Sequence, residues 1–326
     1  MSSFPLNNGR SLPAVGLGTY AWMGTGEREI LPNAVYDAIS VGVRHIDTAW
    51  IYMVEDKVGE GIRRAIDEGI VKREDLTVVT KIWTFNMKRD RLIGQAKLSL
   101  KNLGLDYIDI LMLHWPVCTI DNGNREEWPR NSDGSFALDN ETDIYQETWK
   151  AMEDLVDQGL AKSIGVSNFT PTQLETLMQT ARIKPVVNQV ESTPLLPQTR
   201  TLEVCNKYGI VMTAYSPFGG SPAPQRDKTF APSNPRKQLW ENPVIVSLAE
   251  KYGKTVCQIL LKFHVQRGVA VVPKSVSKER IKQNLDIFDF ELTQEDMDSL
   301  LNLKTGERML LIKKLIPSRY NPYADD

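Results

Sequence analysis

The sequence predicts an α/β protein built as a (β/α)8 TIM barrel, a single domain over residues 1–326. The chain has 326 residues, a length that such barrels often reach as one domain. Hydrophobic residues make up 41% of it, which is enough for a large core. Eight short segments rich in β-forming residues alternate with longer segments of helical period, the pattern of parallel strands joined by helices.

The expected elements follow one another in a regular order. Residues 4–12 should form an N-terminal β-hairpin, because Asn8-Gly9 suits a turn in which both central residues adopt positive φ. Helices are expected from near Lys57, from Trp149 to Val156, over 256–264 and from near Thr293. The eight strands should lie at 14–18, before and up to Asp47, and at 76–81, 108–114, 163–167, 185–191, 210–215 and 269–273.

Two βα connections are much longer than the others, namely 117–143 after the fourth strand and 219–242 after the seventh. Long connections in compact domains are usually functional. Both should leave the barrel at the same end. An extended C-terminal tail over 303–326 is a third long segment.

Composition narrows the class of function. The 39 Lys and Arg residues nearly balance the 41 Asp and Glu residues, so no net field attracts nucleic acid or an acidic membrane. The three cysteines lie far apart, as in reduced thiols, and the three histidines lack the spacing of a metal site. No apolar stretch approaches the length of a membrane span. We therefore expect a cytoplasmic protein that holds no metal and acts on a small molecule. A monomer is expected as well.

Polar residues gather where the predicted strands end. In a parallel barrel the chemistry lies at the carboxyl ends of the strands, because the βα loops meet there. Each such residue alone has an ordinary explanation as a turn, rim or packing residue. Their joint position at one end predicts a functional site: Asp47, Lys81, His114, Ser167, Asn168, Gln189, Tyr215, Ser216, Lys274 and Ser275.

One apparent motif is rejected. Residues 16–21, Gly-Leu-Gly-Thr-Tyr-Ala, match the dinucleotide-binding pattern of a Rossmann fold. That pattern must open a helix, whereas Trp-Met-Gly-Thr-Gly follows here. The glycines are better explained by a turn at the end of the first strand.

The ordered series of motifs resembles the aldo-keto reductases, close to the aldose and aldehyde reductase branch, over nearly the whole chain. The matching segments are Gly-Leu-Gly-Thr at 16–19, His-Ile-Asp-Thr-Ala at 45–49 with Tyr52 and Val58-Gly59, Lys81, His-Trp-Pro at 114–116, Gly-Val-Ser-Asn-Phe at 165–169, Asn-Gln-Val-Glu at 188–191, Ala-Tyr-Ser-Pro at 214–217, and Val-Pro-Lys-Ser at 272–275 with Arg280 and Asn284.

The resemblance implies a catalytic group of Asp47, Tyr52, Lys81 and His114. Tyr52 would be the general acid that protonates a carbonyl oxygen. Because a free tyrosine is a weak acid, Lys81 would favour its phenolate, and Asp47 would keep that ammonium charged. His114 would orient the carbonyl oxygen.

The resemblance also implies NADPH as cofactor. Ser167, Asn168 and Gln189 would hold the carboxamide, and Tyr215 would stack on the nicotinamide ring. Lys274 and Arg280 would take the 2′-phosphate, and two cations on one phosphate favour NADPH over NADH. The complete set of implied cofactor residues is Thr19, Tyr20, Asp47, Ser167, Asn168, Gln189, Tyr215, Ser216, Phe218, Gly219, Lys274, Ser275, Val276, Arg280, Gln283 and Asn284.

An aromatic pocket is expected for the substrate, a small carbonyl compound. Large aromatic walls suit aldehydes and hydrophobic ketones, and tail residues such as Met309, Leu310 and Leu311 would close the pocket. The chain departs from the family at Val54, where an Asn is frequent, at Tyr20, where a Trp is frequent, and at Cys257, where an Ala is frequent. The expected pocket residues are Trp22, Tyr52, Trp83, His114, Trp115 and Trp128.

Two other functions stay open. A cofactor-binding regulatory barrel with little turnover would keep the same residues. A phosphate-binding isomerase or lyase is less compatible, because the chain lacks a Gly-rich phosphate loop after the seventh strand and an obvious carboxylate base.

Overall fold

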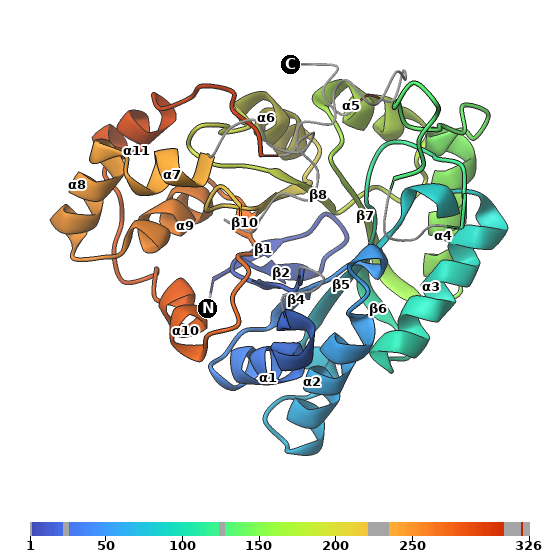
Figure 1. Ribbon diagram of the computed structural model, residues 1–326, viewed down its shortest axis with the longest axis horizontal. Coiled ribbons are helices and arrows are strands. Elements are labelled where there is room, and N and C mark those ends of the chain that lie inside the picture. Colours follow the sequence, from blue (N-terminus) through green and yellow to red (C-terminus); the bar gives the residue numbers. More distant parts are fainter. Residues whose placement is uncertain (1, 22–25, 124–127, 221–234, 310–320, 322–326) are drawn as a thin grey trace.

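Eight parallel strands form one sheet at the centre of the molecule, and helices surround it (Figure 1). The computed structural model describes residues 2–21, 26–123, 128–220, 235–309 and 321. Each strand pairs with the next one in the chain. The strands are β3 Leu17–Gly18, β4 His45–Asp47, β5 Thr77–Ile82, β6 Ile108–Leu113, β7 Ala161–Ser167, β8 Val187–Glu191, β9 Val211–Tyr215 and β10 Ala270–Val271.

The first and last strands meet and close the sheet. Val15 bridges Val271, and Gly18 bridges Lys274, both in parallel orientation. The Gly16 N–H donates to the Val271 carbonyl at 2.8 Å, and the Val271 N–H donates to the Ala14 carbonyl at 2.8 Å. A Cβ on Gly18 would lie 2.7 Å from the Val272 carbonyl oxygen, so this close approach needs glycine. The predicted (β/α)8 barrel is confirmed.

Helices follow the strands around the outside of the barrel (Figure 1). Several begin with a threonine whose hydroxyl accepts from the N–H three residues on, as at Thr255 and Thr293. No helix within the described residues is both long enough and apolar enough to cross a membrane. The helices are α1 Glu27–Ser40, α2 Glu55–Asp67, α3 Arg89–Leu103, α4 Trp149–Asp157, α5 Pro171–Thr180, α6 Thr199–Lys207, α7 Pro235–Trp240, α8 Pro243–Tyr252, α9 Val256–Gln266, α10 Lys278–Leu285 and α11 Gln294–Leu301.

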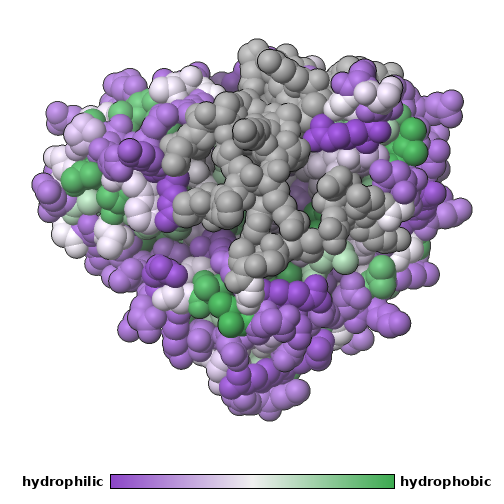
Figure 2. Space-filling view, viewed as in Figure 1, coloured by the Kyte–Doolittle hydropathy of each residue, from purple (hydrophilic) through white to green (hydrophobic). Residues whose placement is uncertain are grey.

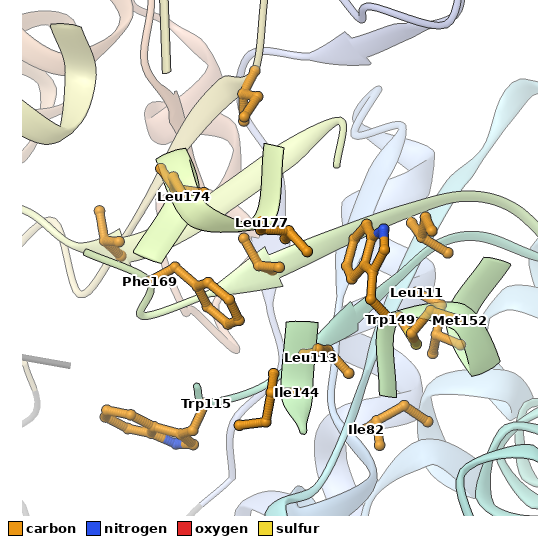
Figure 3. Close-up of a cluster of buried hydrophobic side chains, with 14 of the residues drawn as sticks. Ile82, Leu111, Leu113, Trp115, Ile144, Trp149, Met152, Phe169, Leu174 and Leu177 are labelled. Atoms are coloured by element: carbon orange, nitrogen blue, oxygen red, sulfur yellow. The ribbon is translucent and has the colours of Figure 1, made fainter. Parts of the chain in front are cut away.

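The main core lies between the strands and the helices. Alternate side chains of β6, such as Leu111 and Leu113, point outward and lie in the same buried cluster as Trp149 of α4 (Figure 3). Leu174 and Leu177 of α5 belong to the same cluster. Burial of these large side chains holds the helices against the barrel and fixes the positions of the strand ends.

A hairpin closes the amino end of the barrel. Its strands, β1 Ser3–Pro5 and β2 Ser11–Pro13, pair antiparallel, as predicted. Leu12 packs inside the barrel in a cluster with Val79 and Ile110. The Asn8 side chain donates to the Ser163 hydroxyl at 2.8 Å. The turn differs from the prediction, because Gly9 has positive φ and Asn8 does not. With this end covered, the carboxyl end of the barrel is the one open to chemistry.

The long connections are only partly described. Within the connection after β6, Thr119 and Leu138 form an antiparallel β-bridge. Residues 124–127 of this connection lie outside the described part. The segment expected as a long loop after β9 contains the helix α7, and its residues 221–234 are not described. The same holds for most of the tail beyond residue 309. The described surface visible in Figure 2 is mainly hydrophilic, with hydrophobic residues in small separate groups.

Candidate active site

The candidate site consists of side chains at the open end of the barrel. In a strand, side chains point alternately to the two faces. Val79 of β5 and Ile110 of β6 point inward. Lys81, two residues after Val79, and His114, four residues after Ile110, therefore also point inward, and they lie nearest the open end. The same alternation brings together polar residues from adjacent strands, namely Asp47, Lys81, His114, Ser167, Gln189 and Tyr215.

A buried ion pair lies at the centre of this group. Lys81 Nζ is 2.7 Å from Asp47 Oδ1 and 2.9 Å from the Thr48 carbonyl oxygen. The other carboxylate oxygen of Asp47 accepts from Gln189 Nε2 at 2.8 Å. Burial lowers the pKa of Lys81, and the negative charge of Asp47 opposes this effect. The pairing therefore favours a charged ammonium at a buried position.

Tyr52 stands beside the ion pair. It ends a short 3-10 turn, Trp50–Tyr52, and its ring centroid lies 5.5 Å from Lys81 Nζ. Edge-to-face contacts join its ring to His114 at 5.6 Å and to Tyr20 at 5.0 Å. Burial raises the pKa of Tyr52 well above its ordinary value, and the nearby Asp47 and Tyr20 add to the increase.

This direction differs from the one that the sequence predicted. Burial dominates the pKa of Tyr52 and the net shift is upward, so the effect expected from the charge of Lys81 stays a prediction. The tyrosine is consequently a protonated phenol at neutral pH.

His114 is a neutral imidazole. It is 8% exposed, and burial together with the charge of Lys81 lowers its pKa well below the ordinary value. Its Nδ1 atom is buried and has no hydrogen-bond partner among the described residues. Its backbone carbonyl accepts from Asn168 Nδ2 at 2.9 Å. A neutral ring of this kind can donate one N–H to an oxygen in the site.

The residues predicted to hold the carboxamide form a network around the ion pair. Asn168 adopts a left-handed conformation with φ 64°, and its Oδ1 atom accepts from the Tyr215 hydroxyl at 2.9 Å. The Ser167 hydroxyl donates to the Gln189 carbonyl at 2.8 Å. Ser216 also has positive φ, and the Gly219 N–H donates to its carbonyl at 2.9 Å, which forms a tight turn that includes Phe218. These residues, which the sequence analysis places at one end of the barrel, do lie together.

The residues predicted for the adenosine end lie along the segment after β10. Lys274 and Val276 are half-buried, Ser275 and Asn284 are buried, and Arg280 and Gln283 are exposed. Ser277 caps α10, since its hydroxyl accepts from the Arg280 N–H at 3.4 Å. Thr19 is buried at the end of β3, and its hydroxyl donates to the Asp47 carbonyl at 2.9 Å.

Aromatic side chains line the region beside His114. Trp83 lies 5.1 Å from the His114 ring and 4.8 Å from Trp128, and Trp115 lies 5.7 Å from Trp128. Phe136 stacks on Trp128 at 4.5 Å, a contact that the sequence gave no signal to find. Trp22 and the tail residues Leu310 and Leu311 lie outside the described residues. Met309 is half-buried, and its N–H donates to the Glu191 side chain.

Comparison with known proteins decides the family. Residues 14–304 match the model of the aldo/keto reductase family. This chain belongs to that family. The aldo-keto reductase of Bombyx mori is 41% identical over 309 residues, which cover 94% of this chain and 93% of that protein.

Solved structures of aldo-keto reductases share the same fold. The aldose reductase of Schistosoma japonicum superposes with a TM-score of 0.88 at 33% identity and covers 100% of both chains. The Bombyx mori aldo-keto reductase in complex with NADP superposes with a TM-score of 0.86 at 38% identity and covers 98% of both chains. The predicted resemblance is confirmed, including its extent over nearly the whole chain.

The structure also places the residues at which this aldo-keto reductase departs from the expected motifs. Val54 is buried and precedes α2 without a side-chain cap. Cys257 is half-buried at the start of α9, where burial raises its pKa to about 11 and the charges of Arg236 and Arg280 partly oppose the increase. The rejected Gly-Leu-Gly-Thr-Tyr-Ala motif opens no helix, because α1 begins only at Glu27.

Proposed function

We propose that this aldo-keto reductase is an NADPH-dependent carbonyl reductase whose general acid is Tyr52. The observation that carries the proposal is the buried Asp47–Lys81 ion pair beside a protonated Tyr52 and a neutral His114. A proton donor, a fixed cation and an N–H donor at one open barrel end are the groups that reduction of a carbonyl requires.

The donor set at this end fits a nicotinamide cofactor. The hydroxyl of Ser167 and the amide of Asn168 suit a carboxamide, and the half-buried ring of Tyr215 suits stacking on a planar ring. Lys274 and the exposed Arg280 follow the next strand, where an ammonium and a guanidinium suit a phosphate. The solved NADP complex of the Bombyx mori relative, at 38% identity, supports the same cofactor.

The chain's own residues provide the acid chemistry. Bound NADPH would supply the hydride. Tyr52 holds a proton at its phenol oxygen and gives it to the carbonyl oxygen as negative charge develops there. The Lys81 ammonium, whose Nζ lies 5.5 Å from the Tyr52 ring centroid, would compensate the charge left on Tyr52. Asp47 holds the Lys81 ammonium at 2.7 Å and keeps it charged. His114, being neutral, orients the carbonyl oxygen through an N–H.

The pocket beside these residues favours apolar carbonyl compounds. Trp83, Trp115 and Trp128 present aromatic surface close to His114. Such walls bind aromatic aldehydes and hydrophobic ketones better than strongly polar substrates. We therefore propose a small hydrophobic aldehyde or ketone as substrate.

A Tyr52→Phe variant tests the proposal. It keeps the ring and its packing but removes the proton donor, so we expect turnover of NADPH with a nitrobenzaldehyde to fall by roughly 10²- to 10⁴-fold. Binding of NADPH, followed by fluorescence titration, should be retained.

Tyr36→Phe is the matched control. This tyrosine is on α1, where its hydroxyl bonds to Glu68 at the surface, so its variant should keep full turnover. Near-normal turnover in Tyr52→Phe would contradict the mechanism. Tight NADPH binding by the unaltered protein without turnover on a broad carbonyl panel would instead favour a cofactor-binding regulatory barrel.

A further inference from the structure

An acidic residue occupies the predicted phosphate subsite. The ammonium of Lys274 forms an ion pair with the carboxylate of Glu27, a residue 247 positions earlier in the chain. The pair is sheltered, since the two side chains are 32% and 28% exposed. The backbone of Lys274 forms a parallel β-bridge with Gly18 where the barrel closes, so the Lys274–Glu27 ion pair lies at the open end.

The geometry points to Glu27 as a built-in competitor for the cofactor's 2′-phosphate. We propose that Glu27 sets how strongly this protein prefers a phosphorylated over an unphosphorylated nicotinamide dinucleotide. The inference rests on the proposed function, because it takes Lys274 as a ligand of the 2′-phosphate.

The Glu27 carboxylate and a 2′-phosphate are both negatively charged and would compete for the Lys274 ammonium. Before the cofactor binds, the Lys274 ammonium already has an anionic partner. A 2′-phosphate must either displace the Glu27 carboxylate or stand beside it as a second anion, and both alternatives reduce the gain from the new contact. A dinucleotide without that phosphate leaves the pair intact and avoids this loss. Glu27 therefore weakens NADPH binding selectively.

The position of helix α1 places Glu27 beside Lys274. It is the first residue of α1, directly after Gly26 in left-handed conformation, so its carboxylate lies near the positive end of the helix dipole. Helix α10, which follows the Lys274 segment, packs against α1 (Figure 1). A second ion pair, Lys278–Asp37 at 3.2 Å, joins the same two elements. The packing of α1 against α10 thus places the carboxylate of Glu27 beside Lys274.

Asp37 provides a matched control for a merely structural role. If Glu27 only ties α1 to the segment around α10, then breaking the Lys278–Asp37 pair should have the same effect as breaking the Lys274–Glu27 pair. If Glu27 competes with a phosphate, only its own removal should alter nucleotide preference. A third variant, Glu29→Gln, removes one negative charge from the same helical turn at an exposed residue.

The experiment measures dissociation constants of NADPH and NADH by fluorescence titration. Glu27→Gln should tighten NADPH binding by about two- to fivefold, the range expected for a partly exposed ion pair, and leave NADH within about twofold of its original value. Asp37→Asn and Glu29→Gln should change the ratio of the two constants little. In a Lys274→Met background, Glu27→Gln should lose its effect, because the two residues act through one contact.

Other outcomes separate this inference from the function on which it rests. The role of Glu27 would be overturned if Glu27→Gln changed NADPH and NADH binding equally. It would also be overturned if Glu27→Gln and Asp37→Asn had equal effects, and in both cases the reductase proposal would still stand. Failure of the unaltered protein to bind either dinucleotide would refute the proposed function itself. Should Glu27→Gln fold poorly by circular dichroism, Glu27→Asp keeps the charge but shortens its reach, and it should tighten NADPH binding in the same direction.

Discussion

Removal of a single charge at the centre of the barrel should be far more damaging than removal of one at the surface. Lys81→Met would leave the buried Asp47 carboxylate beside an apolar side chain. An unpaired buried charge costs roughly 3–5 kcal/mol, so we expect the free energy of unfolding in urea to fall by about that amount. The exposed pair Arg64–Glu68 on α2 is the control, and Arg64→Met should change stability little. Similar losses in the two variants would contradict the account of the ion pair.

At the residue scale, sequence predicts position better than chemical state. The alternation of side chains along parallel strands brings Asp47, Lys81 and Gln189 together, and this rule needs no coordinates. The raised pKa of Tyr52 was not predictable, because it depends on how completely the phenol is buried. The contact between Glu27 and Lys274 was not predictable either, since only closure of the barrel brings these two residues together.

At the scale of elements, the N-terminal hairpin is expected to stabilise the whole barrel by filling its amino end. Leu12 is 1% exposed and packs with residues of β5, β6, β8 and β9. Leu12→Ala should therefore lower the free energy of unfolding by roughly 2–5 kcal/mol, as for other buried leucines. The neighbouring exposed Ser11 is the control, and Ser11→Ala should have little effect in the same urea titration. Equal stability of the two variants would mean that the hairpin does not contribute to the core.

The order and type of the main elements were predictable, whereas several boundaries were not. The fifth strand was expected at 163–167 and is Ala161–Ser167, and the helix expected near Lys57 begins at Glu55. The eighth strand was expected at 269–273 but ends at Val271, two residues before Pro273, which has no N–H for a ladder bond. The helix α7 lies in a segment whose Pro and Ser content indicated a loop. Tertiary contacts decide such boundaries, and a single sequence does not reveal them.

At the scale of the whole molecule, the single domain over 1–326, the monomeric state and the cytoplasmic location stay predictions. Size-exclusion chromatography with light scattering would test the monomer directly. The barrel itself was predictable because its signal is spread over eight repeated units. A pocket wall is a local feature, and the wall formed by Trp83, Trp115 and Trp128 depends on how one long connection folds back over the barrel.

The three histidines should make the entire protein sensitive to mild acid. All are buried, and burial lowers the pKa of His45 to about 4, that of His264 to about 3 and that of His114 well below its ordinary value of 6.5. Below pH 6.5 the unfolded chain therefore binds more protons than the folded one. Stability is greatest above that pH and should fall towards pH 4 by as much as about 1.4 kcal/mol per pH unit for each histidine.

Urea unfolding between pH 7 and pH 5 measures this slope. His264→Leu fills a completely buried site with an apolar side chain of similar size. It should therefore reduce the change in unfolding free energy per pH unit by about the contribution of one histidine. Glu55 acts in the opposite direction, because burial raises the pKa of its carboxyl group and stability then increases as that group takes up a proton. Constant stability from pH 7 to pH 6 would show that the histidines titrate normally in the folded protein.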